Sequence, residues 1–232
     1  MAHSHRAFRE RFLDYLLQVS LIVLGLVIAT GADRCNANRQ EDRRLQQYYQ
    51  AILQDLQDEQ RVTAMNIGDA RNDVGQLEYA ITKLALADPD STLAGLDTLR
   101  WVLQKGVFRT FNPTTFDVMV NTGDVSLIDD LSLRSDLAAV FAFRTNIVRP
   151  DLEAYNSQTV RTIEQLATLT DLNCLLQDVG YREVCRPIDA ATATRGKNVL
   201  ISLLLQAKSR LFHLEMLQES VGEMVTRLTP LA

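Results

Sequence analysis

The sequence has few residues that interrupt helices, with only 10 Gly and 5 Pro among its 232 residues. This scarcity excludes a β-sandwich, which needs many turns, and favours an all-α protein. An excess of basic charge is also absent, because the formal net charge at pH 7 is -5. The composition therefore excludes a strongly basic nucleic-acid-binding protein, and we do not expect a nucleic acid as a partner.

Residues that commonly carry chemistry are sparse. The chain has three histidines: His3, His5 and His213. His213 lies two positions before Glu215, on a different face of a helix, so we expect it to be solvated or to cap a helix. The adjacent Asp129 and Asp130 point apart and suit helix capping. No glycine-rich phosphate loop or Gly-x-Ser-x-Gly turn occurs, and we expect a non-enzymatic protein without catalytic residues, metal or cofactor.

One long apolar run stands out from the polar sequence. No charged side chain falls between Asp14 and Asp33, and the run extends back to Phe12. About 20 apolar residues suffice to cross the hydrocarbon layer of a bilayer. We therefore expect an arm at residues 1–11, a transmembrane helix at 12–32 in contact with membrane lipid, and an extramembrane domain at 33–232.

Two other interpretations of the apolar run stay open. A basic start followed by an apolar stretch is also typical of a cleaved signal peptide, and the triplet at 29–31 resembles a cleavage site. Against cleavage, the run is long for a signal core, and the acidic Glu10 and Asp14 precede it. The third interpretation is a helix buried in the protein core.

Three residues form a candidate helix-packing face inside this run. Ser20, Gly25 and Ala29 are spaced by five and four positions, and small side chains let another membrane helix approach closely. The alternative is that these are ordinary small residues of any apolar helix.

The cysteines indicate the compartment. Cys174 and Cys185 flank a short, turn-rich stretch, which a disulfide would stabilise by about 2–3 kcal/mol. Such a bridge would place the large domain in an oxidising compartment. The alternative is two separate buried thiols in a reducing one. Basic residues on the two sides of the apolar run are nearly equal in number, so they determine the orientation only weakly.

Beyond the apolar run the pattern predicts long helices. From Leu45 to Leu84 apolar residues recur at the 3 and 4 spacing of a heptad, which Thr63 and the charges around Glu59 interrupt. No proline precedes Pro89, so one helix can run from the membrane to about Ala87.

Shorter helices follow. One is expected at 92–106, a brief one capped by Thr114 closes at Gly123, and another begins at the caps Asp129, Asp130 and Ser132. Pro150 should kink or break the helical pattern that continues to Leu169.

The last helix is expected to start near Gly196 and to run for about 30 residues, with apolar positions to Leu228. It is long enough to pair antiparallel with the first helix. The predicted architecture is a single transmembrane helix that continues into an elongated, four-helix-like bundle.

The order of parts resembles an uncharacterised family of bacterial single-pass membrane proteins over about the first two thirds of the chain. The similar segments are 21–29, 36–39, 112–117 and 121–129. Where that family has Asn-Asn-Trp-Asn after the membrane, this chain has Asp33-Arg34-Cys35-Asn36. The resemblance implies a single-pass topology in a bacterial inner membrane and supplies no activity. We expect the C-terminal domain in the periplasm because of the possible bridge between Cys174 and Cys185.

Two functions fit these features. The first is an accessory or scaffolding subunit of a respiratory, photosynthetic or transport complex, bound to other subunits through the membrane helix and the bundle. The second is a membrane-tethered sensor that binds a ligand or partner at an aromatic loop containing Phe108, Phe111 and Phe116. An arm of 11 residues leaves no room for an output domain, which disfavours the sensor.

Overall fold

The computed structural model describes the backbone of residues 3–86, 114–169 and 189–232. Between the first two ranges it describes seven residues: Ser91, Ala94, Gly95, Thr98, Leu99, Val102 and Leu103. Before Arg39, side chains are described only for Ser20, Leu21, Val23 and Leu24. The chain forms two compact units, Met1–Gln50 and Ala51–Ala232.

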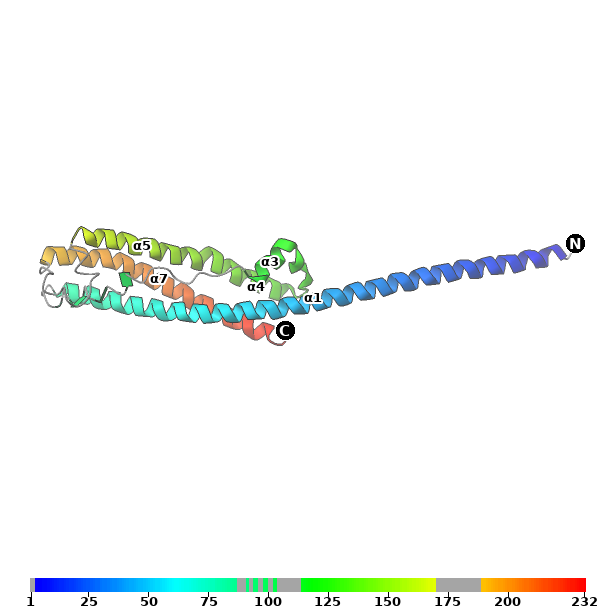
Figure 1. Ribbon diagram of the computed structural model, residues 1–232, viewed down its shortest axis with the longest axis horizontal. Helices are drawn as coiled ribbons and strands as arrows, with labels where there is room; N and C mark the ends of the chain where they lie inside the picture. Colours follow the sequence, from blue (N-terminus) through cyan, green and yellow to red (C-terminus); the bar gives the residue numbers. More distant parts are fainter. Residues whose placement is uncertain are drawn as a thin grey trace. The chain divides into compact units, whose positions relative to one another are not determined.

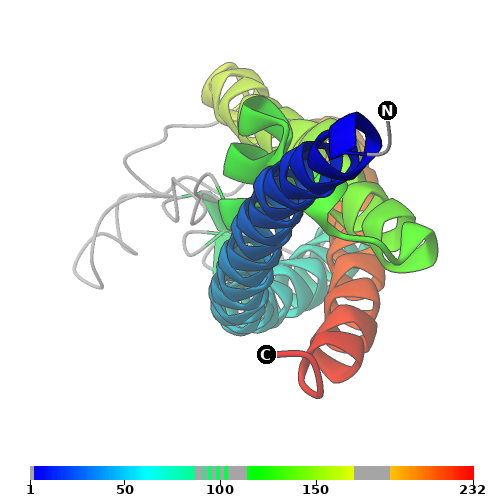
Figure 2. The same ribbon diagram turned by 90° about the vertical axis from the view of Figure 1, so that its right-hand side faces the viewer.

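The described residues form helices and turns without strands, which confirms the all-α class. The elements are α1 (His3–Ala85), α3 (Thr115–Thr122), the 3₁₀ turn η1 (Asp124–Leu127), α4 (Leu131–Phe143), the π-helical turn η2 (Arg144–Val148), α5 (Arg149–Ala167) and α7 (Ala190–Leu228). In the second unit, α5 and α7 lie alongside the cyan part of α1, as Figures 1 and 2 show from two sides. Contacts from Asp73 to Arg210 and from Glu78 to Lys208 run antiparallel. They confirm the predicted bundle of antiparallel long helices.

The first unit consists of the N-terminal part of α1, so the helix predicted at 12–32 is helical in the structure. The residues whose side chains are described include no helix that is long and apolar enough to cross a membrane. Most of the predicted span, including Gly25 and Ala29, lies outside those side chains. Ser20, the third residue of the candidate packing face, is exposed.

Local capping signals place the short helices as the sequence predicts. Thr114 and Asp117 form a capping box at the start of α3, and Gly123 ends that helix with a φ of 82°. Asp130, rather than Asp129, caps α4 by accepting the backbone N–H groups of Ser132 and Leu133. Each cap satisfies backbone donors that a helix end leaves without partners.

One predicted helix boundary is wrong. The last helix starts at Ala190 instead of near Gly196, because Asp189 accepts the backbone N–H of Thr192 and caps it. The interruption expected at Pro150 takes the form of the π-helical turn η2, which separates α4 from α5. Pro150 is the second residue of α5, so the N–H that it lacks would have bonded into this widened turn.

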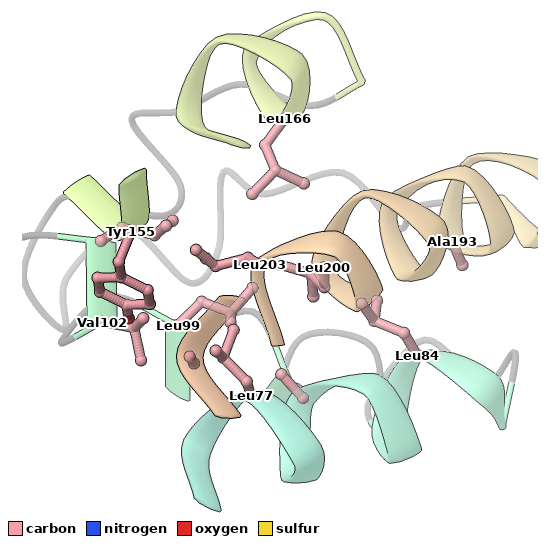
Figure 3. Close-up of a cluster of buried hydrophobic side chains, with 12 residues drawn as sticks. Leu77, Leu84, Leu99, Val102, Tyr155, Leu166, Ala193, Leu200 and Leu203 are labelled. Carbon is pink, nitrogen blue, oxygen red and sulfur yellow. The ribbon is translucent and has the colours of Figure 1, made fainter. Parts of the chain in front are cut away.

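An apolar cluster fills the end of the bundle where α1 finishes and α7 begins (Figure 3). It contains the described residues Leu99, Val102 and Leu103, which are helical as the sequence predicts for 92–106. The other members come from α1, α5 and α7: Leu77, Ala80, Leu84, Tyr155, Leu166, Ala193, Leu200, Leu203 and Ala207. Burial of these side chains joins four segments that are far apart in the sequence.

Two glycines in this region differ in the space around them. A Cβ at Gly95 would lie 3.0 Å from Lys83 Cβ and 3.1 Å from the carbonyl oxygen of Ala80. A Cβ at Gly75 would meet nothing within 4 Å. Gly95 therefore permits close approach of its segment to α1, whereas Gly75 only costs helix propensity.

We expect Gly75→Ala to raise the free energy of unfolding by about 0.5–1 kcal/mol, because alanine loses less backbone entropy in a helix. Gly95→Ala should lower it by about 1–3 kcal/mol, since the backbone oxygen of Ala80 cannot easily give way. Denaturant titrations followed by circular dichroism measure both changes. A stabilising Gly95→Ala would show that the close approach is not tight.

Candidate functional site

The heptad stripe of α1 continues without a break through its polar residues. From Ile52 to Leu84, the buried positions recur every three or four residues, and four of them are polar: Glu59, Thr63, Asn66 and Asp73. All four are at most 6% exposed. The interpretation that Glu59 and Thr63 interrupt the stripe is therefore wrong. Polar side chains occupy core positions, and their partners come from distant segments.

The first polar centre joins three helices. Arg210 of α7 donates from Nη2 to Asp73 Oδ2 of α1 at 2.9 Å, and the Tyr155 hydroxyl of α5 donates to the same oxygen at 3.2 Å. The Arg210 guanidinium carbon lies 3.8 Å from the centroid of the Tyr155 ring. The Arg210 and Asp73 side chains are 0% and 1% exposed.

Burial decides the chemistry of this centre. Desolvation, followed by the negative charge of Asp73, raises the pKa of Tyr155 far above its ordinary value, so its hydroxyl stays protonated and donates. Two charges inside a bundle are costly unless they are paired and hydrogen-bonded. The centre therefore fixes the register of α1, α5 and α7, because any slip would leave a buried charge without its partner.

The second polar centre surrounds Arg144 in the π-helical turn. Arg144 donates from Nη1 to Glu59 Oε2 at 3.0 Å and from Nη2 to Asp117 Oδ2 at 3.1 Å. Its guanidinium carbon lies 5.0 Å from the ring centroid of Phe141, which stacks on Phe116 at 4.9 Å. Arg144 therefore connects α1, α3 and η2.

The two carboxylates at Arg144 are shifted in opposite directions. Burial raises the pKa of Glu59, and the neighbouring Arg144 only partly opposes it. Burial also acts to raise the pKa of Asp117, but hydrogen bonds from the backbone and hydroxyl of Thr114, together with Arg144, outweigh it and lower that pKa. Glu59 is thus the carboxylate whose charge is costly in the folded protein.

The raised pKa of Glu59 predicts a pH dependence. Between its ordinary value of 4.5 and its higher folded value, the folded state binds more protons than the unfolded state. The stability contributed by Glu59 is therefore fully present below pH 4.5 and is lost as the pH rises through the folded pKa. Denaturation of the wild type and of Glu59→Gln at several pH values measures this loss.

In that comparison Asp117 is common to both chains, so its opposite contribution at low pH cancels. We expect the stability of the wild type relative to Glu59→Gln to fall as the pH rises above 4.5. A difference that rises with pH would mean that Arg144 lowers the Glu59 pKa more than burial raises it.

A third polar cluster lies between α5 and α7. Asp151 accepts from Gln206 Nε2 at 2.6 Å and from the Ser209 hydroxyl at 3.3 Å, and its Oδ2 lies 2.9 Å from His213 Nδ1. His213 is partly buried and is neither simply solvated nor a helix cap, so that expectation is wrong. Glu215, two residues on, pairs with Arg71 on the α1 side.

None of these contacts resembles a substrate site. Glu59 Oε1, Thr63 Oγ1 and Asn66 Nδ2 have no hydrogen-bond partner among the described residues, but all three lie on one buried stripe of α1. In the parts of the chain that the structure describes, no group of three His, Cys, Asp or Glu side chains is placed to hold a metal ion. The arrangement orients helices with respect to one another.

The predicted partner loop is only partly described. Phe116 is 3% exposed and stacks on Phe141 in the core, so its assignment to a partner surface is wrong. Phe108 and Phe111 lie outside the described residues, as do Cys174 and Cys185. Asp73, Arg144 and Arg210 were not predicted as site residues from the sequence. Their heptad spacing with apolar neighbours was the signal that could have identified them.

No protein-family model, no curated protein and no solved structure matches the chain.

Proposed function

We propose that this chain is a non-enzymatic, single-pass membrane protein that acts as an accessory or scaffolding subunit of a larger membrane complex. The observation that carries the proposal is that the buried charges of the bundle hold its helices together. Asp73 and Arg210 are sealed inside the bundle at 1% and 0% exposure and join helices instead of lining a site. A helical bundle whose helices are fixed to one another by buried ion pairs is suited to holding other subunits in place.

The membrane part of the proposal rests on the sequence. The run at 12–32 is long and apolar enough to span a bilayer, and no charge falls between Asp14 and Asp33. The resemblance of segments 21–29 and 36–39 to bacterial single-pass membrane proteins supports an inner-membrane anchor. A bridge between Cys174 and Cys185 would support a periplasmic bundle.

The contact of Phe116 with Phe141 favours the scaffold over the sensor. It removes one of the three aromatic side chains on which a ligand-binding loop would rely. A sensor would need another surface for its ligand, and the three polar centres are occupied by contacts between helices.

Extraction of native membranes tests the anchor. We expect the full-length wild type to stay in the membrane pellet after an alkaline wash. Val23→Arg should move much of it to the supernatant, because a charge at the centre of a span costs about 2.5–3.5 kcal/mol. Met65→Arg, at an exposed site of the second unit, is the matched control and should stay in the pellet. Wash-out of the wild type would contradict the anchor.

A substitution at Gly25 tests the candidate helix-packing face of the membrane helix. Gly25→Ile would keep the anchor apolar while preventing close approach of a neighbouring helix. We expect the variant to remain in the membrane and to lose its partner subunits during purification in mild detergent. A complex of unchanged composition would show that this face is idle.

A further inference from the structure

The outward face of α7 carries an exposed apolar stripe. Ile201, Leu205, Phe212 and Met216 are 38%, 64%, 58% and 41% exposed and follow one another at spacings of four, seven and four. The buried positions of the same helix, which include Leu203, Ala207, Arg210, Leu214 and Leu217, form the opposite side. Scattered exposed apolar residues need no explanation, but four on one helix face form a contact surface.

The sides of α7 are already used within the chain. Lys208 pairs with Glu78 and Glu215 pairs with Arg71, so this edge of α7 is fastened to α1. The opposite edge contacts α5 through the side chains around Asp151. The apolar stripe lies between these two edges and faces outward.

The stripe is symmetric about its own middle. If α7 is reversed about a point between Lys208 and Ser209, Ile201 takes the place of Met216, and Leu205 takes that of Phe212. Two copies of α7 laid antiparallel would therefore place each large apolar residue opposite another. Such a self-complementary patch is what a twofold-symmetric dimer requires.

The charged residues of α7 are also complementary to those of a reversed second copy. Basic residues lie toward its start, at Arg195 and Lys197, and acidic residues toward its end, at Glu219 and Glu223. The basic Arg227 in the last turn is paired with Asp136 of α4. In the reversed copy, Lys197 comes next to Glu219 and Arg195 next to Glu223. A parallel arrangement would instead place each charge opposite its own copy and would be repulsive. Charge complementarity thus selects an antiparallel second copy of this chain as the occupant.

We propose that the outward face of α7 is a homodimer interface, formed by two antiparallel α7 helices about a twofold axis near Lys208 and Ser209. The interface uses only copies of this chain, so it goes beyond the proposed scaffold function and does not depend on it.

Sedimentation of the purified full-length chain in mild detergent tests the apolar part of the interface. We expect a dimer for the wild type and a dimer dissociation constant about tenfold higher or more for Leu205→Glu, which places a carboxylate opposite Phe212 at both ends of the contact. Because Leu205 is 64% exposed, the variant should keep the helical circular dichroism of the wild type. Val160→Glu, at a 55% exposed site of α5, is the matched control and should remain dimeric.

Charge reversal tests the antiparallel register. Lys197→Glu and Glu219→Lys should each weaken the dimer, and the double variant should restore it, because the two side chains then exchange roles across the axis. A monomeric wild type, or an equal effect of Val160→Glu, would overturn the interface. Single reversals without effect, or a double variant that stays weak, would overturn the antiparallel register.

Discussion

Replacing Arg210 with methionine should lower the free energy of unfolding by about 3–5 kcal/mol. Methionine occupies a similar volume but leaves Asp73 as a buried carboxylate that keeps the hydrogen bond from the Tyr155 hydroxyl and loses its paired positive charge. Removal of one partner is costly because the other charge stays in a region from which water is excluded. Denaturant unfolding of the full-length chain in mild detergent, followed by circular dichroism, measures the change.

Two further variants test whether the unpaired charge of Asp73 causes the loss of stability in Arg210→Met. Tyr155→Phe removes one hydrogen bond and should cost about 1 kcal/mol, well below the effect of losing the charge partner. Asp73→Leu combined with Arg210→Met removes both charges and should recover most of the stability lost by Arg210→Met alone. A change under about 1 kcal/mol for Arg210→Met would mean that water reaches Asp73 and that the centre does not brace the bundle.

Replacing Arg144 with methionine should produce the second-largest loss, about 3 kcal/mol at pH 7. Glu59 then loses its cation inside the bundle, and the contact of Asp117 with α1 through the shared guanidinium is lost. Without Arg144 the already raised pKa of Glu59 rises further. The loss should therefore be smaller at pH 5, where Glu59 can take up a proton, than at pH 7.

Arg149→Met is the matched control, because this exposed arginine lies five residues further along the same helical segment. It should change stability by no more than about 0.5 kcal/mol at either pH. An Arg144→Met loss that is the same at pH 5 and pH 7 would contradict the assignment of the cost to ionised Glu59.

The sequence predicts the local features of the fold best. Thr114, Gly123 and Asp130 act within one helical turn, and all three end or begin a helix as expected. The apolar stripes and the antiparallel pairing of α1 with α7 follow from heptad spacing and helix length. The caps depend on neighbours in the chain, and the stripes and helix lengths depend on spacing along it, both of which a single sequence contains in full.

The polar centres could not be predicted because their partners are distant. Glu59 alone resembles a solvated residue, and only Arg144, 85 positions away, explains its burial. Asp73 and Arg210 are 137 positions apart. A charged residue at a core heptad position is a signal of such a pair, but spacing does not identify its partner.

The most direct test of the proposed function is the mass and composition of the particle that contains this chain when it is purified from its native membrane in mild detergent. We expect native mass spectrometry to find the chain with at least one other membrane subunit in a fixed stoichiometric ratio. A particle that contains only this chain would contradict the scaffold function. Two copies in that particle would leave the homodimer intact, whereas a single copy would contradict the homodimer as well.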